Sequence, residues 1–434
     1  MKEIKINKTN EILYYDKLYN GLEIYIIPNK YQKNYYMTFT TKFGSCNTEF
    51  KLKDEKNYKK VPNGIAHYLE HLMFNMEDGT AFDYFSKLGS SVNAYTTYDL
   101  TCYEVYSSTF FKENLNYLLD YVQTPYFTNE LVNNERGIIT EEIKMYDNNP
   151  NTELTYSAYK NIFVNDKRKY LISGTIDDIK KITKENLYEC YNTFYNPENM
   201  FIIITGNVDP NEAIGIIEKN QKQKKFKNVD FVEKEIAEPT KVNTKYKEIY
   251  MNVETNKINI SYKIPTKLFK KKELSKIELN IYISIIYNIL FGSTSIIQDK
   301  LISSKIIQNG ININKTFTKD FIIISITCES NYPDTVIRYI NEVTNNIEID
   351  EETLKRKIKA YKSSYILHFD DIELVNSNIQ DNILEYGCFI DNYMDLYDDL
   401  NILKMNEIAK KLKNIQESIL IIKPKNEEIK DKDK

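Results

Sequence analysis

The chain has 434 residues, a length that favours two or more domains, each large enough to bury its own core. Its net charge of −4 excludes the strong positive field that binds nucleic acid or an anionic membrane. The five cysteines are scattered and form no Cys-x-x-Cys pair, so neither a disulfide framework nor a thiolate zinc site is predicted. Residues 1–5 lack the apolar run of a signal peptide, and we find no apolar stretch approaching the length of a membrane span. We therefore expect a cytoplasmic protein that binds neither nucleic acid nor membrane.

The first half of the chain has the pattern of a mixed α+β unit. Apolar runs at residues 22–27 and 35–42 predict two strands with a turn between them. A helix-start signal at residues 62–64 precedes apolar side chains spaced by three or four positions, which predicts a helix with one buried face. A strand at 101–107, helices from about 111 to 194 and a closing strand at 200–205 complete the half.

The second half repeats this order of elements after a polar stretch at 219–247. Its basic run, residues 222–227, predicts a solvated linker; nucleic-acid binding is the weaker alternative. Beyond the linker we expect strands at 248–253 and 258–264, a helix at 273–290, a strand at 321–327, helices from 333 and a strand at 418–422.

Two copies of one unit account for this repetition. We predict an α+β fold of two similar mixed α/β domains, each an antiparallel sheet with helices packed on one face. The boundaries are 1–220 for the first domain, 221–247 for the linker and 248–425 for the second domain. Residues 426–434 alternate in charge and are predicted to form a disordered tail.

Two of the three histidines, His67 and His71, lie four positions apart in the predicted helix of the first half. This is just over one helical turn, so both imidazoles leave the same face. Glu70 lies near enough to that face to reach a water molecule on a metal ion. The His-x-x-Glu-His order is the inverted zinc-peptidase motif, so the pattern predicts a zinc-dependent peptidase. The third histidine, His368, has no second ligand nearby in sequence, and we interpret it as an ordinary structural residue.

A catalytic zinc ion takes three protein ligands and keeps one open position. The best candidate for the third ligand is Glu142, in a segment that reads as a helix. Glu135 precedes it by two turns and shares its face, whereas Glu141 points elsewhere. A second acid on the ligand's face would support the site. A solvated helix acid is the alternative for Glu135.

Three segments give the chain a specific resemblance to the pitrilysin/insulinase family of zinc peptidases, in particular to the branch resembling mitochondrial processing peptidase and its bacterial relatives. They are residues 63–74 around the histidines, residues 89–96 (Gly-Ser-Ser-Val-Asn-Ala-Tyr-Thr) and residues 135–142. Residues 195–200, leading into 206–209, resemble the end of the family's catalytic domain. The resemblance covers most of the first half, and the second half matches in layout only.

The resemblance implies a role for each motif residue. One zinc ion per chain would be bound by His67, His71 and Glu142. Glu70 would be the catalytic general base, and Glu135 would be the second acid of the catalytic site.

The resemblance also implies three substrate-binding residues. Asn93 and Ala94 would lie on an edge strand whose main chain pairs with an extended peptide; an ordinary edge strand is the alternative. Phe74 would line a pocket beside the scissile bond, although its spacing alone favours the core.

One departure from the family pattern concerns the second half. Many members supply an arginine there, and a tyrosine seven residues later, that bind the substrate near the scissile bond. Ile302 and Asn309 stand at these positions here, and neither Arg338 nor Arg356 has a tyrosine at that spacing. An apolar side chain cannot supply the donor geometry of arginine. The resemblance therefore implies a heterodimer, in which this chain forms half of a clamshell chamber and a homologous partner subunit supplies the arginine/tyrosine pair.

We therefore expect a zinc metalloendopeptidase that hydrolyses short or unfolded peptides. One alternative is a maturation protease that removes the leader from a small ribosomally made peptide. The other is a non-catalytic subunit that assembles with a partner. Such a scaffold has no need of all four residues His67, Glu70, His71 and Glu142, which argues against it.

Overall fold

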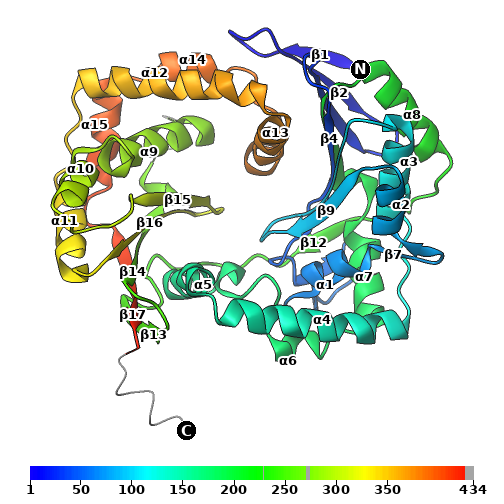
Figure 1. Ribbon diagram of the computed structural model, residues 1–434, viewed down its shortest axis with the longest axis horizontal. Coiled ribbons are helices and arrows are strands. Elements are labelled where there is room, and N and C mark those ends of the chain that lie inside the picture. Colours follow the sequence, from blue (N-terminus) through cyan, green and yellow to red (C-terminus); the bar gives the residue numbers. More distant parts are fainter. Residues whose placement is uncertain (228, 270–273, 426–434) are drawn as a thin grey trace. The chain divides into compact units, whose positions relative to one another are not determined.

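The computed structural model describes residues 1–227, 229–269 and 274–425, so the tail predicted at 426–434 lies outside the described residues. The chain forms two compact units, each assembled from three segments (Figure 1). Unit 1 comprises Met1–Lys144, Leu171–Glu235 and Tyr365–Asn392. Unit 2 comprises Met145–Tyr170, Ile236–Ser364 and the residues from Tyr393 onward.

Unit 1 is built on a seven-stranded sheet with the order β1-β2-β3-β11-β4-β10-β9. Strands β3 and β11 are parallel, and the other neighbours are antiparallel. The strands are β1 (Lys2–Lys5), β2 (Ile12–Lys17), β3 (Glu23–Pro28), β4 (Tyr35–Thr41), β9 (Ser91–Thr96), β10 (Thr101–Ser107) and β11 (Met200–Gly206). Two small sheets accompany it, one of β5 (Glu49–Leu52), β6 (Lys59–Lys60) and β12 (Phe231–Glu233), the other of β7 (Asn75–Met76) and β8 (Gly79–Thr80).

Helices pack on the apolar face of this sheet. Because side chains alternate along a strand, Met37 and Phe39 of β4 share this face with Ile202 and Ile204 of β11, and all four are in the core. The helices are α1 (Ile65–Leu72), α2 (Ala81–Lys87), α3 (Phe111–Val122), α4 (Asn129–Asp147), α6 (Ile176–Ile179), α7 (Lys184–Phe194) and α8 (Pro210–Lys222).

Unit 2 has a five-stranded sheet with the order β13-β17-β14-β16-β15, in which β13 and β17 are parallel and the other neighbours are antiparallel. Its strands are β13 (Tyr246–Met251), β14 (Asn256–Pro265), β15 (Asn312–Phe317), β16 (Phe321–Ser330) and β17 (Gln416–Pro424). Its helices include α9 (Lys276–Phe291), α10 (Ile296–Ser303), α11 (Pro333–Asn345), α12 (Glu351–Leu367), α14 (Tyr393–Asp398) and α15 (Ile402–Lys411). The order and directions are those of β3-β11-β4-β10-β9 in unit 1. The predicted fold of two similar mixed α/β domains is therefore confirmed.

Each sheet is also covered by a helix from the other half of the chain. Helix α13 (Ile372–Tyr386) packs on β4 and β11 of unit 1, and α5 (Pro150–Ile162) packs on the equivalent strands β14 and β17 of unit 2. The predicted boundaries at 220 and 248 follow chain order and omit this exchange. Helix α13 also lies on the sheet face opposite to the other helices. The sequence pattern predicts helices on one face only.

Polar side chains hold α13 on the sheet. The hydroxyl of Thr38 donates a hydrogen bond to the amide oxygen of Asn376 at 2.8 Å, and the amide of Gln380 donates to the Thr40 hydroxyl at 3.1 Å. The Tyr95 hydroxyl of β9 donates to the amide oxygen of Gln380 at 2.7 Å. A buried polar group that lacks a partner is costly, so these pairs select one register of α13 on the sheet.

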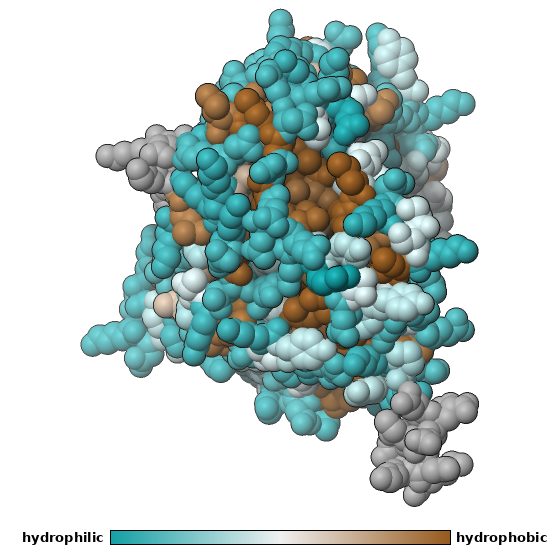
Figure 2. Space-filling view, turned by 90° about the vertical axis from the view of Figure 1, so that its left-hand side faces the viewer, coloured by the Kyte–Doolittle hydropathy of each residue, from teal (hydrophilic) through white to brown (hydrophobic). Residues whose placement is uncertain are grey.

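One helical segment of unit 2 corrects the expectation that no apolar stretch approaches a membrane span. By length and composition the segment Lys276–Ser303 could cross a bilayer, with a mean hydropathy of 1.4 in its most apolar window. However, 67% of that window is buried inside the protein, and α9 supplies much of the core of unit 2. Figure 2 shows the side of the molecule where α10 and α11 lie in Figure 1, with apolar areas interspersed among hydrophilic ones. The segment has the burial of a core helix.

Candidate metal centre

Helices α1 and α4 of unit 1 lie side by side and carry the candidate site (Figure 1). Helix α1 begins after Gly64, whose φ of +82° favours glycine, and a Cβ atom there would lie 2.2 Å from the carbonyl oxygen of Ser173. Gly174 has a φ of +71°, and a Cβ atom on it would lie 2.7 Å from the carbonyl oxygen of Asn63. The two backbones therefore touch where only glycines fit, which fixes the start of the helix that carries the histidines.

The three predicted metal ligands converge. The Nε2 atom of His67 lies 3.7 Å from Oε1 of Glu142, and the Nε2 atom of His71 lies 3.5 Å from Oε2 of Glu142. One ligand atom from each of the three residues can be chosen so that all lie within 4.8 Å of one another. Ligand atoms in a tetrahedral zinc site are about 3.4 Å apart, because each bond is about 2.1 Å long. The two histidine–carboxylate distances fit such a site.

The polar atoms at this point also fit a cation. Oε2 of Glu142 is buried and has no hydrogen-bond partner among the residues that the structure describes. Burial, and to a lesser extent the proximity of His71, lowers the pKa of His67 to about 3, so its imidazole is neutral and available as a ligand near neutral pH. Three carboxylates, those of Glu70, Glu135 and Glu142, raise the pKa of His71 although burial opposes them. A divalent cation would compensate this excess of negative charge.

Glu135 contacts one of the two histidines. Its Oε1 atom lies 2.8 Å from Nδ1 of His71. With the proton on Nδ1 donated to this carboxylate, the lone pair of Nε2 is directed at Glu142, as a metal ligand requires. Nδ1 of His67 is buried without a comparable partner in the described part of the chain. Glu135 therefore supports only the His71 side of the site.

Replacing Glu135 by alanine is expected to weaken zinc binding roughly 10- to 100-fold, because His71 loses the group that holds its tautomer and ring orientation. Competition against a chromogenic chelator would measure the affinity. The matched control is Glu141→Ala on the same helix, since the Glu141 side chain is 74% exposed and is paired with Lys144. Equal affinities for the two variants would contradict this role of Glu135.

Glu70 is placed between the metal ligands and the sheet. Its side chain is only 7% exposed, and its Oε2 atom accepts a hydrogen bond of 2.7 Å from the hydroxyl of Thr96, the last residue of β9. Burial raises the pKa of Glu70; the Thr96 hydroxyl and His71 oppose this shift, and Glu142 adds to it. A carboxylate with a raised pKa beside the ligands has the properties of a general base.

The three predicted substrate-binding residues are placed differently from one another. Strand β9 is the last strand of its sheet, with Asn93 exposed and donating to Glu104 at 3.1 Å, and Ala94 half-buried against the core. Phe74 is 8% exposed and lies in the aromatic core, where Phe82 stacks on it with ring centroids 4.3 Å apart. Phe82 is 50% exposed, so it is the aromatic residue of this pair that reaches the surface. The role of Phe74 beside a substrate stays a prediction.

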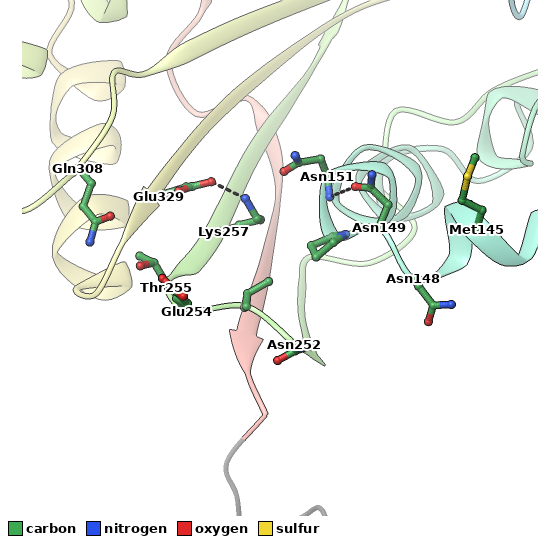
Figure 3. Close-up of a pocket in the computed structure, with 12 residues that line it drawn as sticks. Met145, Asn148, Asn149, Asn151, Asn252, Glu254, Thr255, Lys257, Gln308 and Glu329 are labelled. Carbon is green, nitrogen blue, oxygen red and sulfur yellow. Dashed lines mark hydrogen bonds and ion pairs between the residues drawn. The ribbon is translucent and has the colours of Figure 1, made fainter.

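Sequence reasoning missed the Thr96 contact with Glu70 and a pocket of about 650 Å³ in unit 2. Asparagine and glutamine side chains and the ion pair of Lys257 with Glu329 contribute to the pocket's lining (Figure 3). This pair already satisfies the charges of both side chains. Within the described ranges, the one group of three residues that could hold a metal ion is His67, His71 and Glu142. The candidate metal centre therefore lies on α1 and α4.

A helix with the His-x-x-Glu-His motif and a carboxylate from a second helix define the class of inverted zinc peptidases. Residues 55–175 match the model of the insulinase family, peptidase family M16, and residues 181–361 match the model of the M16 inactive domain. The chain belongs to the insulinase (M16) peptidase family, which confirms the resemblance found in the sequence.

Individual relatives agree with this assignment. The uncharacterized zinc protease YmfH of Bacillus subtilis is 34% identical over 422 residues, which span 96% of each chain. The crystal structure of an M16-like peptidase from Alicyclobacillus acidocaldarius has a TM-score of 0.90 at 25% identity and covers 97% of this chain and 100% of its own. The periplasmic protease PqqL of Escherichia coli has the same fold, with a TM-score of 0.75 at 19% identity; the match covers 99% of this chain but 49% of PqqL.

Proposed function

We propose that this protein is a zinc-dependent endopeptidase that hydrolyses short or unfolded peptides. The observation that carries the proposal is the convergence of His67, His71 and Glu142 on one point, with the carboxylate of Glu70, on the same helix, close enough to interact with His71 and Glu142. The name zinc protease, which YmfH carries, supports the same activity. A non-catalytic subunit is the weaker alternative. Its support is the match of residues 181–361 to the M16 inactive domain, but that match lies outside the metal ligands.

The mechanism assigns one task to each group. Zinc held by His67, His71 and Glu142 would lower the pKa of a water molecule and polarise the scissile carbonyl. Glu70 would accept a proton from the attacking water and pass it to the leaving amine. Strand β9, with Asn93 and Ala94, would hold the peptide in an extended conformation through main-chain hydrogen bonds at the open edge of the sheet.

Zinc binding is testable without a substrate. Adding zinc to the metal-free chain should raise its melting temperature, because a ligand that binds the folded state at 1,000 times its Kd stabilises that state by about 4 kcal/mol. The Glu142→Ala variant should show little of this shift, whereas Glu141→Ala should match the wild type. Scanning calorimetry at fixed zinc concentration measures the effect. An equal shift in all three proteins would place the metal elsewhere.

We further propose that the active enzyme is a heterodimer of this chain and a homologous subunit. Ile302, on α10, is apolar, so it cannot replace the arginine of the family pattern. Asn309 has an amide in place of the tyrosine's phenol, and this amide lies 3.5 Å from Glu329. Because this whole chain matches only about half of PqqL, PqqL is long enough to hold two such units, which supports pairing of this chain with a second one. The five cysteines, all in the described part of the chain, form no disulfide with one another, which fits the reducing cytoplasm that we propose as the location.

The experiment that tests the function is digestion of a mixture of unfolded peptides by the zinc-loaded chain, with products identified by mass spectrometry. Slow cleavage that is lost on chelation and restored by zinc supports the peptidase, and sedimentation measures whether the chain is alone. Cleavage by the isolated chain at a rate typical of a complete enzyme, about 10 turnovers per second, would contradict the heterodimer. Cleavage confined to the junction of one leader peptide would favour a maturation protease.

A further inference from the structure

We infer that Thr96 is a positioning residue that fixes the carboxylate of Glu70 from the edge strand β9. This inference rests on the proposed function, because it concerns the group that would act as the base. Thr96 ends β9, and its hydroxyl donates to Oε2 of Glu70 at 2.7 Å. Among the described residues, Thr96 is the side chain that is hydrogen-bonded to the Glu70 carboxylate. It leaves the other carboxylate oxygen, Oε1, for a water molecule.

The neighbouring hydroxyl of Thr101 donates elsewhere, which leaves the hydroxyl of Thr96 to donate to Glu70. Thr96 is paired with Thr101 in the β9–β10 register, and the two hydroxyl oxygens are 3.4 Å apart. A threonine hydroxyl has one hydrogen to donate. The hydroxyl oxygen of Thr101 lies 2.8 Å from the carbonyl oxygen of Phe43, which is closer than its 3.4 Å distance to the Thr96 hydroxyl. Thr101 therefore donates to the backbone, and the hydrogen of Thr96 is directed to Glu70.

Strand β9 is held from both faces of the sheet. Ala94 packs on the core side and Thr96 reaches Glu70, whereas Tyr95 points to the opposite face and donates to Gln380 of α13. A threonine side chain has few χ1 rotamers, so its hydroxyl has a defined position once the strand is fixed. A glutamate, by contrast, loses rotational freedom about three side-chain bonds when it is held in one position. The strand that would bind the peptide thus also sets the position of the base.

The test compares Thr96→Val, which keeps the shape and strand propensity but removes the donor, with Thr96→Ser, which keeps the donor. Crystal structures of both variants show the orientation of Glu70, and peptide kinetics with the zinc-loaded protein give kcat and KM separately. Since general-base catalysis contributes about 10²–10⁴-fold, we expect the valine variant to lose roughly 10- to 100-fold in kcat at unchanged KM. The serine variant should keep the wild-type orientation of Glu70 and stay within about threefold in kcat. Thr155→Val, on α5, is the matched threonine control and should behave as the wild type.

An unchanged Glu70 orientation in Thr96→Val, with kcat within about twofold of wild type, would overturn the inference. An equal loss in the valine and serine variants would also overturn it, because the loss would then occur whether or not the hydroxyl donor is kept. If the wild-type chain alone cleaves no peptide, that failure concerns the proposed function or its missing partner subunit and not Thr96. The Glu70 orientation in the two crystal structures still decides whether Thr96 positions it.

Discussion

Replacing Glu70 by glutamine should abolish peptide hydrolysis while the protein still binds zinc. Glutamine keeps the size of the side chain and an oxygen that can accept the Thr96 hydrogen bond, but it cannot take a proton from water. A general base contributes about 10²–10⁴-fold to a rate, so kcat should fall by at least about 100-fold. The measurement is mass spectrometry of an unfolded-peptide digest, with the zinc content of each protein determined in parallel.

Glu141→Gln is the matched control for this substitution. Glu141 is an exposed glutamate next to the ligand Glu142, and it is paired with Lys144 at 2.7 Å. Its amide variant should retain the full rate. Full activity in a zinc-bound Glu70→Gln protein would show that another group takes the proton. Loss of zinc together with activity would assign Glu70 to metal binding instead.

The sequence was most informative where chemistry is tied to a fixed local geometry. His67 and His71 share a helix face because four residues make about one turn, and the structure has both in α1. Glu142 and Glu135 share a face of α4 for the same reason. Helical spacing does not show which histidine each of these two glutamates approaches. The helical segment made Glu142 the candidate third ligand and the family resemblance then implied the same role, whereas the contact of Glu135 with His71, and not with His67, depends on how α1 and α4 pack.

Contacts between distant segments were beyond sequence reasoning. Thr96 ends the family-like segment 89–96, but it meets Glu70 only because β9 lies next to α1, a contact that the segment itself does not indicate. Asn376 and Gln380 have the pattern of ordinary helix polar residues, yet they are buried on the sheet of unit 1. An amphipathic helix carries no local signal for the sheet that it covers. For this reason the exchange of α5 and α13 was absent from boundaries drawn in chain order.

A buried ion pair in unit 2 was missed for the same reason. Lys263 of β14 has a fully buried side chain, and it is paired with Glu238, which is 6% exposed. The lysine also donates to the carbonyl oxygens of Ile162 and Lys241, at 3.1 and 3.0 Å. The Glu238 carboxylate accepts three backbone N–H groups from residues 164–166, at 2.9, 2.6 and 2.7 Å. The pair therefore attaches the end of the exchanged helix α5 to the sheet of unit 2.

Replacing Glu238 by glutamine should lower the free energy of unfolding by about 3–5 kcal/mol, because Lys263 would then be a buried charge without a counter-charge. Urea denaturation would measure the loss. The control is Glu189→Gln, which breaks the partly exposed pair with Lys59 and should cost at most about 1 kcal/mol. Adding Lys263→Met to Glu238→Gln should restore part of the stability, since the unpaired charge is removed. Equal losses in the two single variants would contradict a special role for the buried pair.

The same pair predicts how stability depends on pH. Burial alone would raise the pKa of Glu238, but Lys263 and the three N–H groups outweigh it and lower the pKa below its ordinary value of 4.5. A carboxyl group whose pKa is lower in the folded state stabilises the fold above its unfolded pKa, and this contribution disappears as the pH falls through the folded pKa. The stability difference between wild type and Glu238→Gln should therefore be full near pH 7 and shrink below about pH 4. A difference that stays constant across this range would show that the glutamine variant is destabilised by altered packing, because lost packing does not titrate.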